Sequence, residues 1–312
     1  MIAIEGLSKY FGETRALKDL SFEVATGEII GLVGKNGAGK STVLKILSAQ
    51  MLPSAGRVWI DNVSVTEQPQ AVRARLGYLP EVAPLYRDMS VAGYLQFAGR
   101  LRQIPKERIQ EKLTAVAEET GLTHVLGERV SGLSRGYQQR VGIAQAMIHR
   151  PPVVLLDEPM GGLDPLQIVQ IRDLIQQMRG HHTVLFSSHI LSEITNICDR
   201  VILIDQGAVR AEGTEEALRR DLSPWRRLLV VVRGKSDQVR KTLGGIRGVT
   251  VKSMTESQGN VVQARLAVEE DVRAEIGKAC SSGGLGLLEM RSEADGLEDL
   301  FLQLVGKGEN AA

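Results

Sequence analysis

The sequence predicts an α/β fold followed by a smaller α+β domain, and three observations support this expectation. Short apolar runs, Ile29–Val33 and Val153–Leu156, are typical of buried parallel strands, and each precedes a segment with helical periodicity. The length of 312 residues corresponds to about two domains at roughly 150 residues each. Around Arg219–Arg227, a basic stretch containing Ser223-Pro224 interrupts the pattern and indicates a domain boundary.

The first domain is expected to span residues 1–222. Its strand Ile29–Val33 leads into a helix over Lys40–Ala49, and residues 83–150 form a mostly helical subdomain, with apolar residues at helical spacing at Ile109, Leu113, Val116 and Ala117. After the strand Val153–Leu156, the pattern predicts a helix whose apolar face consists of Ile168, Ile171, Leu174, Ile175 and Met178. Two further strands are predicted at Thr183–Ser187 and Val201–Asp205, and the second ends in a turn at Asp205-Gln206-Gly207.

The second domain, expected over residues 223–306, has the β-α-β-β-α-β order of a ferredoxin-like fold. Its predicted elements are the strand Leu228–Val232, the helix Asp237–Leu243, the strands Val249–Met254 and Val261–Val268, the helix Glu270–Cys280 and the strand Leu285–Met290. A closing helix over Leu297–Val305 is amphipathic, and residues 307–312 are expected to be frayed. The apolar face of that helix is the reason to expect that this domain contributes contacts between two subunits.

Composition and charge exclude several classes of protein. Hydrophobic residues make up 43% and charged residues 24%, which excludes disorder over most of the chain. The 38 basic and 37 acidic residues leave a net charge of +1, so no nucleic-acid partner is expected. Two cysteines are too few for a disulfide framework and fit a reducing compartment. Since the longest apolar runs are strand-sized, a separate chain is expected to supply any membrane part.

A glycine-rich loop between the first buried strand and its helix carries the strongest chemical signal. It fits the phosphate-binding pattern G-x-x-x-x-G-K-[ST], followed by Thr42: Gly34, Lys35, Asn36, Gly37, Ala38, Gly39, Lys40 and Ser41. Backbone N–H groups and the helix N-terminus would surround the phosphates. Lys40 is expected to reach the β- and γ-phosphates, and the Ser41 hydroxyl to bind Mg²⁺. The alternative is a glycine-rich turn that matches by chance.

Two adjacent carboxylates, Asp157 and Glu158, follow the strand Val153–Leu156 and precede Pro159. Because successive strand side chains point to opposite sides, Asp157 is expected to face the Mg²⁺ shell while Glu158 points elsewhere, free to deprotonate a water. Two acids after a strand can also be a simple loop start, but a preceding phosphate loop favours the catalytic interpretation.

The segment Leu133–Arg140, which reads LSRGYQQR, resembles the LSGGQ signature of ABC-type ATPases, and the order of motifs over residues 1–220 matches that family. The resemblance implies a P-loop NTPase cassette with a RecA-like core and a helical subdomain, binding ATP and Mg²⁺. It places Phe11, with Tyr10 beside it, where an aromatic ring stacks on adenine. It also implies that Glu81 occupies the Q-loop position, which senses the γ-phosphate and places Glu81 near Mg²⁺.

Two further loops complete the resemblance. Gly162-Leu163-Asp164 is similar to the D-loop, which makes Asp164 a candidate nucleotide-binding residue. His189, in Ser187-Ser188-His189, is similar to the switch histidine, although a lone histidine is often structural. The pair His181-His182 is instead expected to be a solvated polar pair before a strand.

In the ABC family two cassettes pack head to tail, so Ser134 and Gly136 would contact the ATP of the partner chain. The resemblance therefore implies a homodimer or pseudo-dimer, and a separate polytopic membrane permease as the second partner. The chain would then lie at the cytoplasmic face of the membrane as a peripheral protein.

The sequence departs from the usual family pattern at several positions. Arg135 and Tyr137 replace Gly and Gln, Glu81 replaces Gln, and Met160 and Gly161 replace Thr-Ser. Together with the small second domain, these features resemble the ABC-2-type exporter branch, which includes gliding-motility, nitrous-oxide-reductase-maturation and multidrug-type subunits. The implied function is the ATP-hydrolysing subunit of an exporter. The alternative is a soluble ABC-type ATPase that acts on ribosomes or nucleic acid, although such proteins usually carry two cassettes or long coiled-coil insertions.

Overall fold

A computed structural model describes residues 1–312 apart from 192–193, 195–196, 223–225, 258, 269 and 294–312. The chain divides into two compact units, Met1–Glu215 and Glu216–Ala312. The predicted boundary at residues 222 and 223 lies slightly further along the chain than this division. The predicted closing helix Leu297–Val305 and the tail 307–312 lie outside the described residues.

The centre of the first unit is a six-stranded sheet in the order β10-β9-β3-β8-β7-β6. All neighbouring pairs are parallel except β9 and β10. The strands are β3 (Ile29–Val33), β6 (Leu76–Leu79), β7 (Val153–Leu156), β8 (Thr183–Ser188), β9 (Arg200–Asp205) and β10 (Ala208–Gly213). Every residue of β3 and β7 is buried, which confirms that these apolar runs are internal strands.

A second sheet of the first unit is antiparallel and has the order β2-β1-β4-β5. It comprises β1 (Ile2–Phe11), β2 (Thr14–Val24), β4 (Ala55–Ile60) and β5 (Val63–Ser64). The sequence interpretation did not include this sheet. Its core is continuous with that of the parallel sheet, because Ile4 and Val58 share one apolar cluster with Leu44 and Leu155. Burial in that cluster stabilises the contact between the two sheets.

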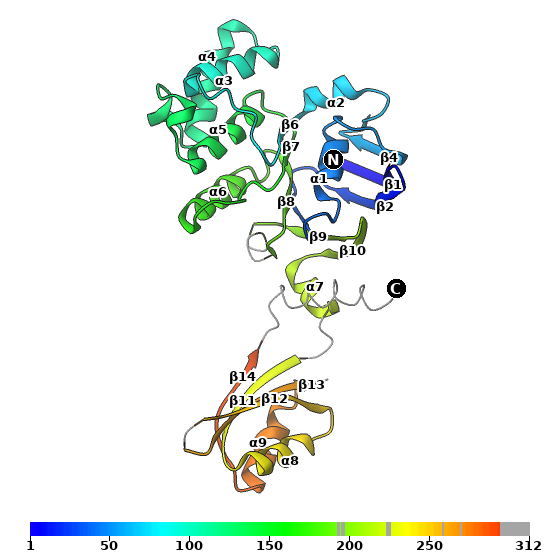
Figure 1. Cartoon of the computed structure of the whole chain (residues 1–312), viewed down its shortest axis with the longest axis vertical. Helices are drawn as coiled ribbons and strands as arrows, with labels where there is room; N and C mark the ends of the chain where they lie inside the picture. Colours follow the sequence, from blue (N-terminus) through cyan, green and yellow to red (C-terminus); the bar gives the residue numbers. More distant parts are fainter. Residues whose placement is uncertain (192–193, 195–196, 223–225, 258, 269, 294–312) are drawn as a thin grey trace. The chain divides into compact units, whose positions relative to one another are not determined.

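Helices join the strands of the first unit. They are α1 (Lys40–Leu47), α2 (Pro69–Arg75), α3 (Val91–Leu101), α4 (Lys106–Glu119), α5 (Arg135–Met147), α6 (Pro165–Gln177) and, at the border between the units, α7 (Glu215–Leu222). Helix α1 ends earlier than predicted, because Ala49 takes a left-handed backbone with φ 55°. Figure 1 shows α3, α4 and α5 grouped together, which confirms the helical region. Among the described residues, we find no helix with the length and apolar character needed to cross a membrane.

The turn between β9 and β10 joins the two sheets to the phosphate loop. Gln206 and Gly207 both have positive φ, as expected for a tight hairpin. The carbonyl of Gly207 accepts a hydrogen bond from Lys18 N at 2.6 Å, and Gly207 N donates to Ala38 O at 3.0 Å. A Cβ at residue 207 would lie 2.3 Å from Ala16 O, so this turn requires glycine.

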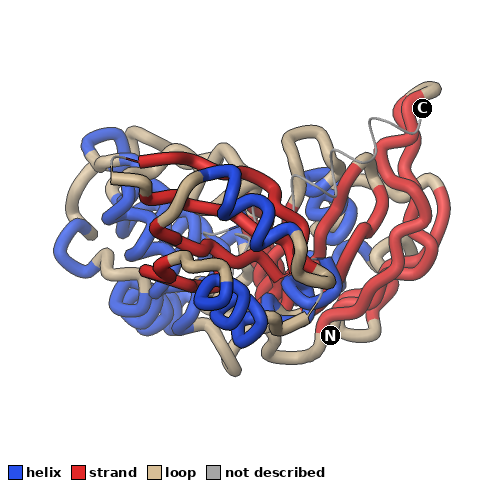
Figure 2. Tube along the Cα trace, turned by 90° about the horizontal axis from the view of Figure 1, so that it is seen from below, coloured by secondary structure: helices blue, strands red, loops and turns tan. Residues whose placement is uncertain are grey.

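The second unit contains an antiparallel sheet in the order β12-β13-β11-β14. Its elements are β11 (Arg226–Arg233), α8 (Ser236–Gly244), β12 (Val249–Ser257), β13 (Val261–Val268), α9 (Arg273–Ser282) and β14 (Gly286–Glu293). This order confirms the ferredoxin-like prediction for the described part of the unit. One apolar cluster joins the helices to the sheet and includes Val230, Val239, Leu266 and Ile276. Figure 2 separates helices and strands by colour.

Candidate active site

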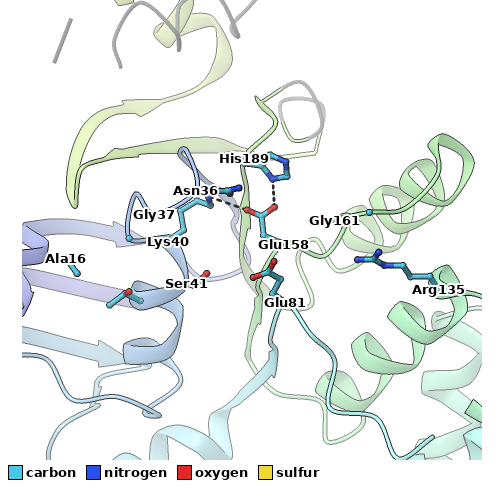
Figure 3. Close-up of a pocket in the computed structure, with 13 residues that line it drawn as sticks. Ala16, Asn36, Gly37, Lys40, Ser41, Glu81, Arg135, Glu158, Gly161 and His189 are labelled. Atoms are coloured by element: carbon cyan, nitrogen blue, oxygen red, sulfur yellow. Dashed lines mark hydrogen bonds and ion pairs between the residues drawn. The ribbon is translucent and has the colours of Figure 1, made fainter. Parts of the chain in front are cut away.

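The carboxyl ends of β3, β7 and β8 meet at one edge of the parallel sheet, and a cavity of about 460 Å³ opens there. This volume falls within the range of about 300–1,000 Å³ that is typical of small-molecule sites. Figure 3 shows the cavity, whose lining residues come from both motifs and from the helical region: Ala16, Asn36, Gly37, Gly39, Lys40, Ser41, Thr42, Glu81, Arg135, Glu158, Gly161, Gly162 and His189.

The phosphate loop places a buried cation at the start of α1. Gly39 has φ 111°, and a Cβ there would lie 2.6 Å from the Leu17 side chain, so this position requires glycine. Lys40 is only 5% exposed, and its Nζ donates to Gly34 O at 2.7 Å and to Lys35 O at 3.3 Å. Ala38 is buried. The loop therefore holds the ammonium group in a fixed position beside the helix N-terminus.

The carboxylate of Asp157 lies at the base of the site and is buried. Its Oδ1 accepts hydrogen bonds from Ser41 Oγ at 3.1 Å and from Ser187 Oγ at 2.7 Å. Glu81 lines the cavity together with Ser41. Hydroxyl and carboxylate oxygens are the donors that Mg²⁺ prefers, so the residue types present fit this ion.

Glu158 lies between two nitrogen groups, as Figure 3 shows. Its Oε1 is 3.3 Å from Lys40 Nζ, and its Oε2 is 2.8 Å from His189 Nδ1. The expectation that Glu158 points elsewhere than the Mg²⁺ shell stays a prediction. The strand alternation behind it does not apply, because β7 ends at Leu156 and Glu158 has a left-handed φ of 48°.

Several predicted site residues lie outside the cavity lining found among the described residues. Tyr10 and Phe11 are exposed at the end of β1, where Arg15 lies over the Tyr10 ring and Lys9 over the Phe11 ring. Their contact with adenine stays a prediction.

The predicted D-loop and signature residues occupy helix starts. Asp164 caps α6 and accepts a hydrogen bond from Gln167 N at 2.9 Å. Ser134 caps α5 and accepts one from Tyr137 N. Gly136 is buried, and a Cβ there would collide with the Gln167 side chain. The structure describes a single chain, so the contact of Ser134 and Gly136 with a partner's ATP stays a prediction.

The sequence interpretation did not assign site roles to Arg135 and Ser187. The Arg135 guanidinium lies against Gly162, where a Cβ would come within 2.7 Å of it, so the signature and the D-loop touch within one chain. Ser187 is buried beside Asp157 and Glu158. Ser187 could have been identified as a site residue from its place near the end of a buried strand. Strand β8 pairs in parallel with β7, so the carboxyl ends of the two strands lie side by side.

A second hollow of about 420 Å³ lies beside the first. Glu81 and Arg135 line both cavities, so they form a wall common to the two. Val82, at the second hollow, is 81% exposed, although large apolar side chains are more often buried. The other lining residues are Ala83, Leu85, Arg87, Gln138 and Gln139.

The expectation of a solvated histidine pair is wrong for His182. His182 is buried, and its Nδ1 lies 2.6 Å from Pro151 O. Burial lowers its pKa from the ordinary value. His181 is exposed, as predicted.

A phosphate loop, a strand-borne carboxylate that binds its serine, and a second carboxylate beside a histidine define a P-loop nucleoside triphosphatase. A family model described as ABC transporter matches residues 17–161. The ABC transporter ATP-binding protein NatA of Bacillus subtilis (strain 168) is 36% identical over 224 residues, which cover 70% of this chain and 91% of NatA. The chain therefore belongs to the ABC transporter ATP-binding proteins and is an ATP-binding, ATP-hydrolysing cassette.

Two further similarities extend this result. The daunorubicin resistance ATP-binding protein DrrA3 of Streptomyces coeruleorubidus is 29% identical over 306 residues, which cover 98% of this chain and 96% of DrrA3. The similarity to DrrA3 thus includes the second unit. A dimeric bacterial ABC transporter cassette, MJ0796, superposes with a TM-score of 0.63 and 25% identity over 69% of this chain and 98% of that one. Cassettes of this family dimerise and act with membrane subunits.

Proposed function

We propose that this ATPase drives an ABC-2-type membrane exporter, in which closure of two cassettes around ATP moves a separate polytopic permease. The similarity to DrrA3 over nearly the whole chain supports an exporter, because that relative is a daunorubicin resistance ATP-binding protein. The observation that carries the coupling is the common wall, since Glu81 and Arg135 line both the nucleotide cavity and the neighbouring hollow. Location at the cytoplasmic face of the membrane is part of this proposal.

The charged and hydroxyl side chains of the site have distinct roles in this scheme. The buried Lys40 binds the β- and γ-phosphates, to which the loop presents backbone N–H groups. Ser41, Asp157 and Glu81 would hold Mg²⁺, which when bound neutralises developing phosphate charge. Asp157 accepts a hydrogen bond from the Ser41 hydroxyl, which leaves the oxygen lone pairs of Ser41 free for a metal.

Glu158 acts as the general base for the attacking water, and His189 orients the Glu158 carboxylate. The ion pair between Lys40 and Glu158 holds that carboxylate in the cavity before ATP binds. Phosphate groups compete for Lys40, because they offer it more negative charge than one carboxylate. ATP binding therefore releases Glu158 from Lys40 and leaves it hydrogen-bonded to His189.

Two copies of the chain complete each site. Ser134 and Gly136 lie at the N-terminus of α5, a feature that favours anions, and would face the γ-phosphate held by the partner. Asp164 would contribute from the D-loop, and Phe11 with Tyr10 would stack on adenine. ATP then holds the dimer together, and hydrolysis weakens it.

The second hollow is the surface on which we place the permease. The exposed Val82 offers apolar area, and Arg87 offers charge at the rim. A movement of Glu81 or Arg135 on ATP binding changes the shape of this surface directly, because both side chains line it.

A pull-down tests the exporter function. Tagged Glu158→Gln protein is captured from detergent-solubilised native membranes with ATP and Mg²⁺, and its partners are identified by mass spectrometry. We expect a stoichiometric polytopic membrane protein, and loss of that partner when Val82→Asp is added. The matched control is Leu101→Asp, which places the same charge at an exposed apolar position outside the hollow.

Ribosomal or nucleic-acid partners without a membrane protein would replace the exporter by the soluble alternative. Equal loss of the partner in the Val82 and Leu101 variants would leave the exporter in place but move the docking surface elsewhere.

A further inference from the structure

The hydroxyl of Ser187 connects the two adjacent acidic residues of the site. Ser187 lies near the end of β8 and is 0% exposed. Its Oγ donates to Asp157 Oδ1 at 2.7 Å and accepts from Glu158 N at 2.8 Å. A serine hydroxyl offers one donor and two acceptor positions, so this single side chain binds both residues at once.

The backbone of Glu158 needs such a contact. Its φ of 48° is left-handed, a conformation that costs roughly 1–2 kcal/mol in a residue other than glycine. Strained backbone of this kind persists only where neighbouring groups hold it. The Glu158 N–H is bound by Ser187 Oγ, and the Glu158 carbonyl accepts from Gly161 N at 3.0 Å. Both sides of the residue are therefore fixed.

The position of the Glu158 carboxylate depends on that backbone. Since β7 has ended at Leu156, no strand pairing determines where the side chain points. The left-handed turn brings Oε1 to 3.3 Å from Lys40 and Oε2 to 2.8 Å from His189. An ordinary extended backbone at Glu158 would send the side chain in another direction.

We propose that Ser187 is a positioning residue for ATP hydrolysis, which holds Glu158 in its left-handed conformation. This inference rests on the proposed role of Glu158 as the general base. Removing the hydroxyl leaves the Glu158 N–H without this acceptor and lets the carboxylate leave its position. Small displacements of a reacting group can cost about a hundredfold in rate.

Thr183→Val provides a matched control for Ser187→Ala. Thr183 lies at the opposite end of β8, is 1% exposed, and accepts a hydrogen bond from Gly27 N at 2.9 Å. Both variants thus delete a buried hydroxyl of the same strand that accepts one backbone N–H. Of these two hydroxyls, the one that contacts Asp157 and Glu158 is that of Ser187. A purely structural role of Ser187 therefore predicts the same kinetics for both variants.

Steady-state ATP hydrolysis and ATP affinity are measured for Ser187→Ala, Ser187→Thr and Thr183→Val, each checked for folding by thermal unfolding. We expect kcat of Ser187→Ala to fall about 10- to 100-fold, with KM and ATP affinity within about threefold of the parent. Ser187→Thr, which keeps the hydroxyl, is expected to recover most of kcat. Thr183→Val is expected to keep the parental kcat.

Glu158→Gln and the double variant with Ser187→Ala separate the two levels of the proposal. We expect the double variant to be no slower than Glu158→Gln, because Ser187 acts through Glu158. Normal turnover by Glu158→Gln would overturn the base itself. An inactive Glu158→Gln together with equal kinetics of Ser187→Ala and Thr183→Val would overturn only the role of Ser187. If Ser187→Thr does not fold, the double variant decides the question, since additive losses would contradict the proposal.

Discussion

The parallel sheet of the first unit and the antiparallel sheet of the second differ in the burial of their strands and in where the strands end. Strands β3 and β7 are buried at every residue, whereas β12 has only partly buried and exposed positions. Parallel neighbours end at the same edge, so Lys40, Asp157 and His189 follow three adjacent strands into one region. Antiparallel neighbours end at opposite edges, which disperses their loops. In the part of the chain that the structure describes, every residue that lines the ATP cavity belongs to the first unit.

The largest effect is expected from a substitution of the buried Lys40 in the first unit. Lys40→Ala is expected to abolish ATP binding and to lower turnover by about a thousandfold, because the phosphate charge loses its main side-chain partner. Binding of a fluorescent ATP analogue and phosphate release measure the two effects. The control is Lys45→Ala, which removes an exposed positive charge from the same helix. Unchanged nucleotide affinity of Lys40→Ala would refute the role.

A mixing experiment tests whether the first units of two chains together form each ATP site. Ser134→Arg and Lys40→Ala are each expected to be inactive alone. A 1:1 mixture is expected to recover up to about a quarter of the parental rate, since half of randomly assorted dimers are mixed and each holds one intact site. No recovery in phosphate release, with mixed dimers demonstrated by differential tags, would argue against sharing.

A substitution in the apolar core of the second unit tests whether ATP hydrolysis depends on that unit. Leu266 is 0% exposed in the apolar cluster of that unit, so Leu266→Ala is expected to destabilise it by about 2–5 kcal/mol. ATP turnover at a temperature where the variant is folded is expected to stay unchanged. Calorimetry and phosphate release provide the measurements, with the exposed Gln263→Ala as control. A parallel loss of turnover would show that the site depends on the second unit.

A smaller effect concerns pH, because all 5 histidines lie in the first unit. Burial lowers the pKa of His149 to about 4, below the 6.5 of an unfolded chain. Between pH 6.5 and 4 the unfolded state binds more protons, so stability falls as the pH drops through this window. From pH 7.5 to 5 we expect His149 to account for a loss of about 1 kcal/mol, after allowance for its partial exposure.

Urea unfolding at the two pH values measures this loss. His149→Gln, which keeps a donor for Leu76 O, is expected to reduce the pH dependence. The control is His181→Gln, which removes an exposed histidine from the same unit. Equal slopes for all three proteins would contradict the prediction.

The two units also differ in how far sequence predicts them. In the second unit, the strand Val261–Val268 and the element order follow from periodicity alone. In the first unit, Val153–Leu156 and the phosphate loop are equally readable, because local pattern determines them. The sequence interpretation does not include the antiparallel sheet β2-β1-β4-β5, although Ile2, Ile4 and Leu7 are buried along its first strand. Its signal lies in alternation before the first motif.

Tertiary contacts explain the remaining differences at the site. The direction of Glu158 depends on a left-handed backbone and on Ser187, which lies on a different strand. Arg135 meets Gly162 only after α5 and the loop before α6 have packed. No spacing rule within one segment contains these contacts, because they join segments that are distant along the chain.

The β9–β10 turn has a thermodynamic consequence for the nucleotide. Its glycine, Gly207, binds the phosphate loop through Ala38 and the antiparallel sheet through Lys18. The loop is therefore ordered when the chain folds, and the conformational entropy of its glycines is lost at that stage. A ligand that enters the cavity does not have to order the loop again, so more of its contact energy remains as affinity. The β9–β10 hairpin thus increases the affinity of the cavity for a nucleotide by ordering the phosphate loop, although no side chain of the hairpin lines the cavity.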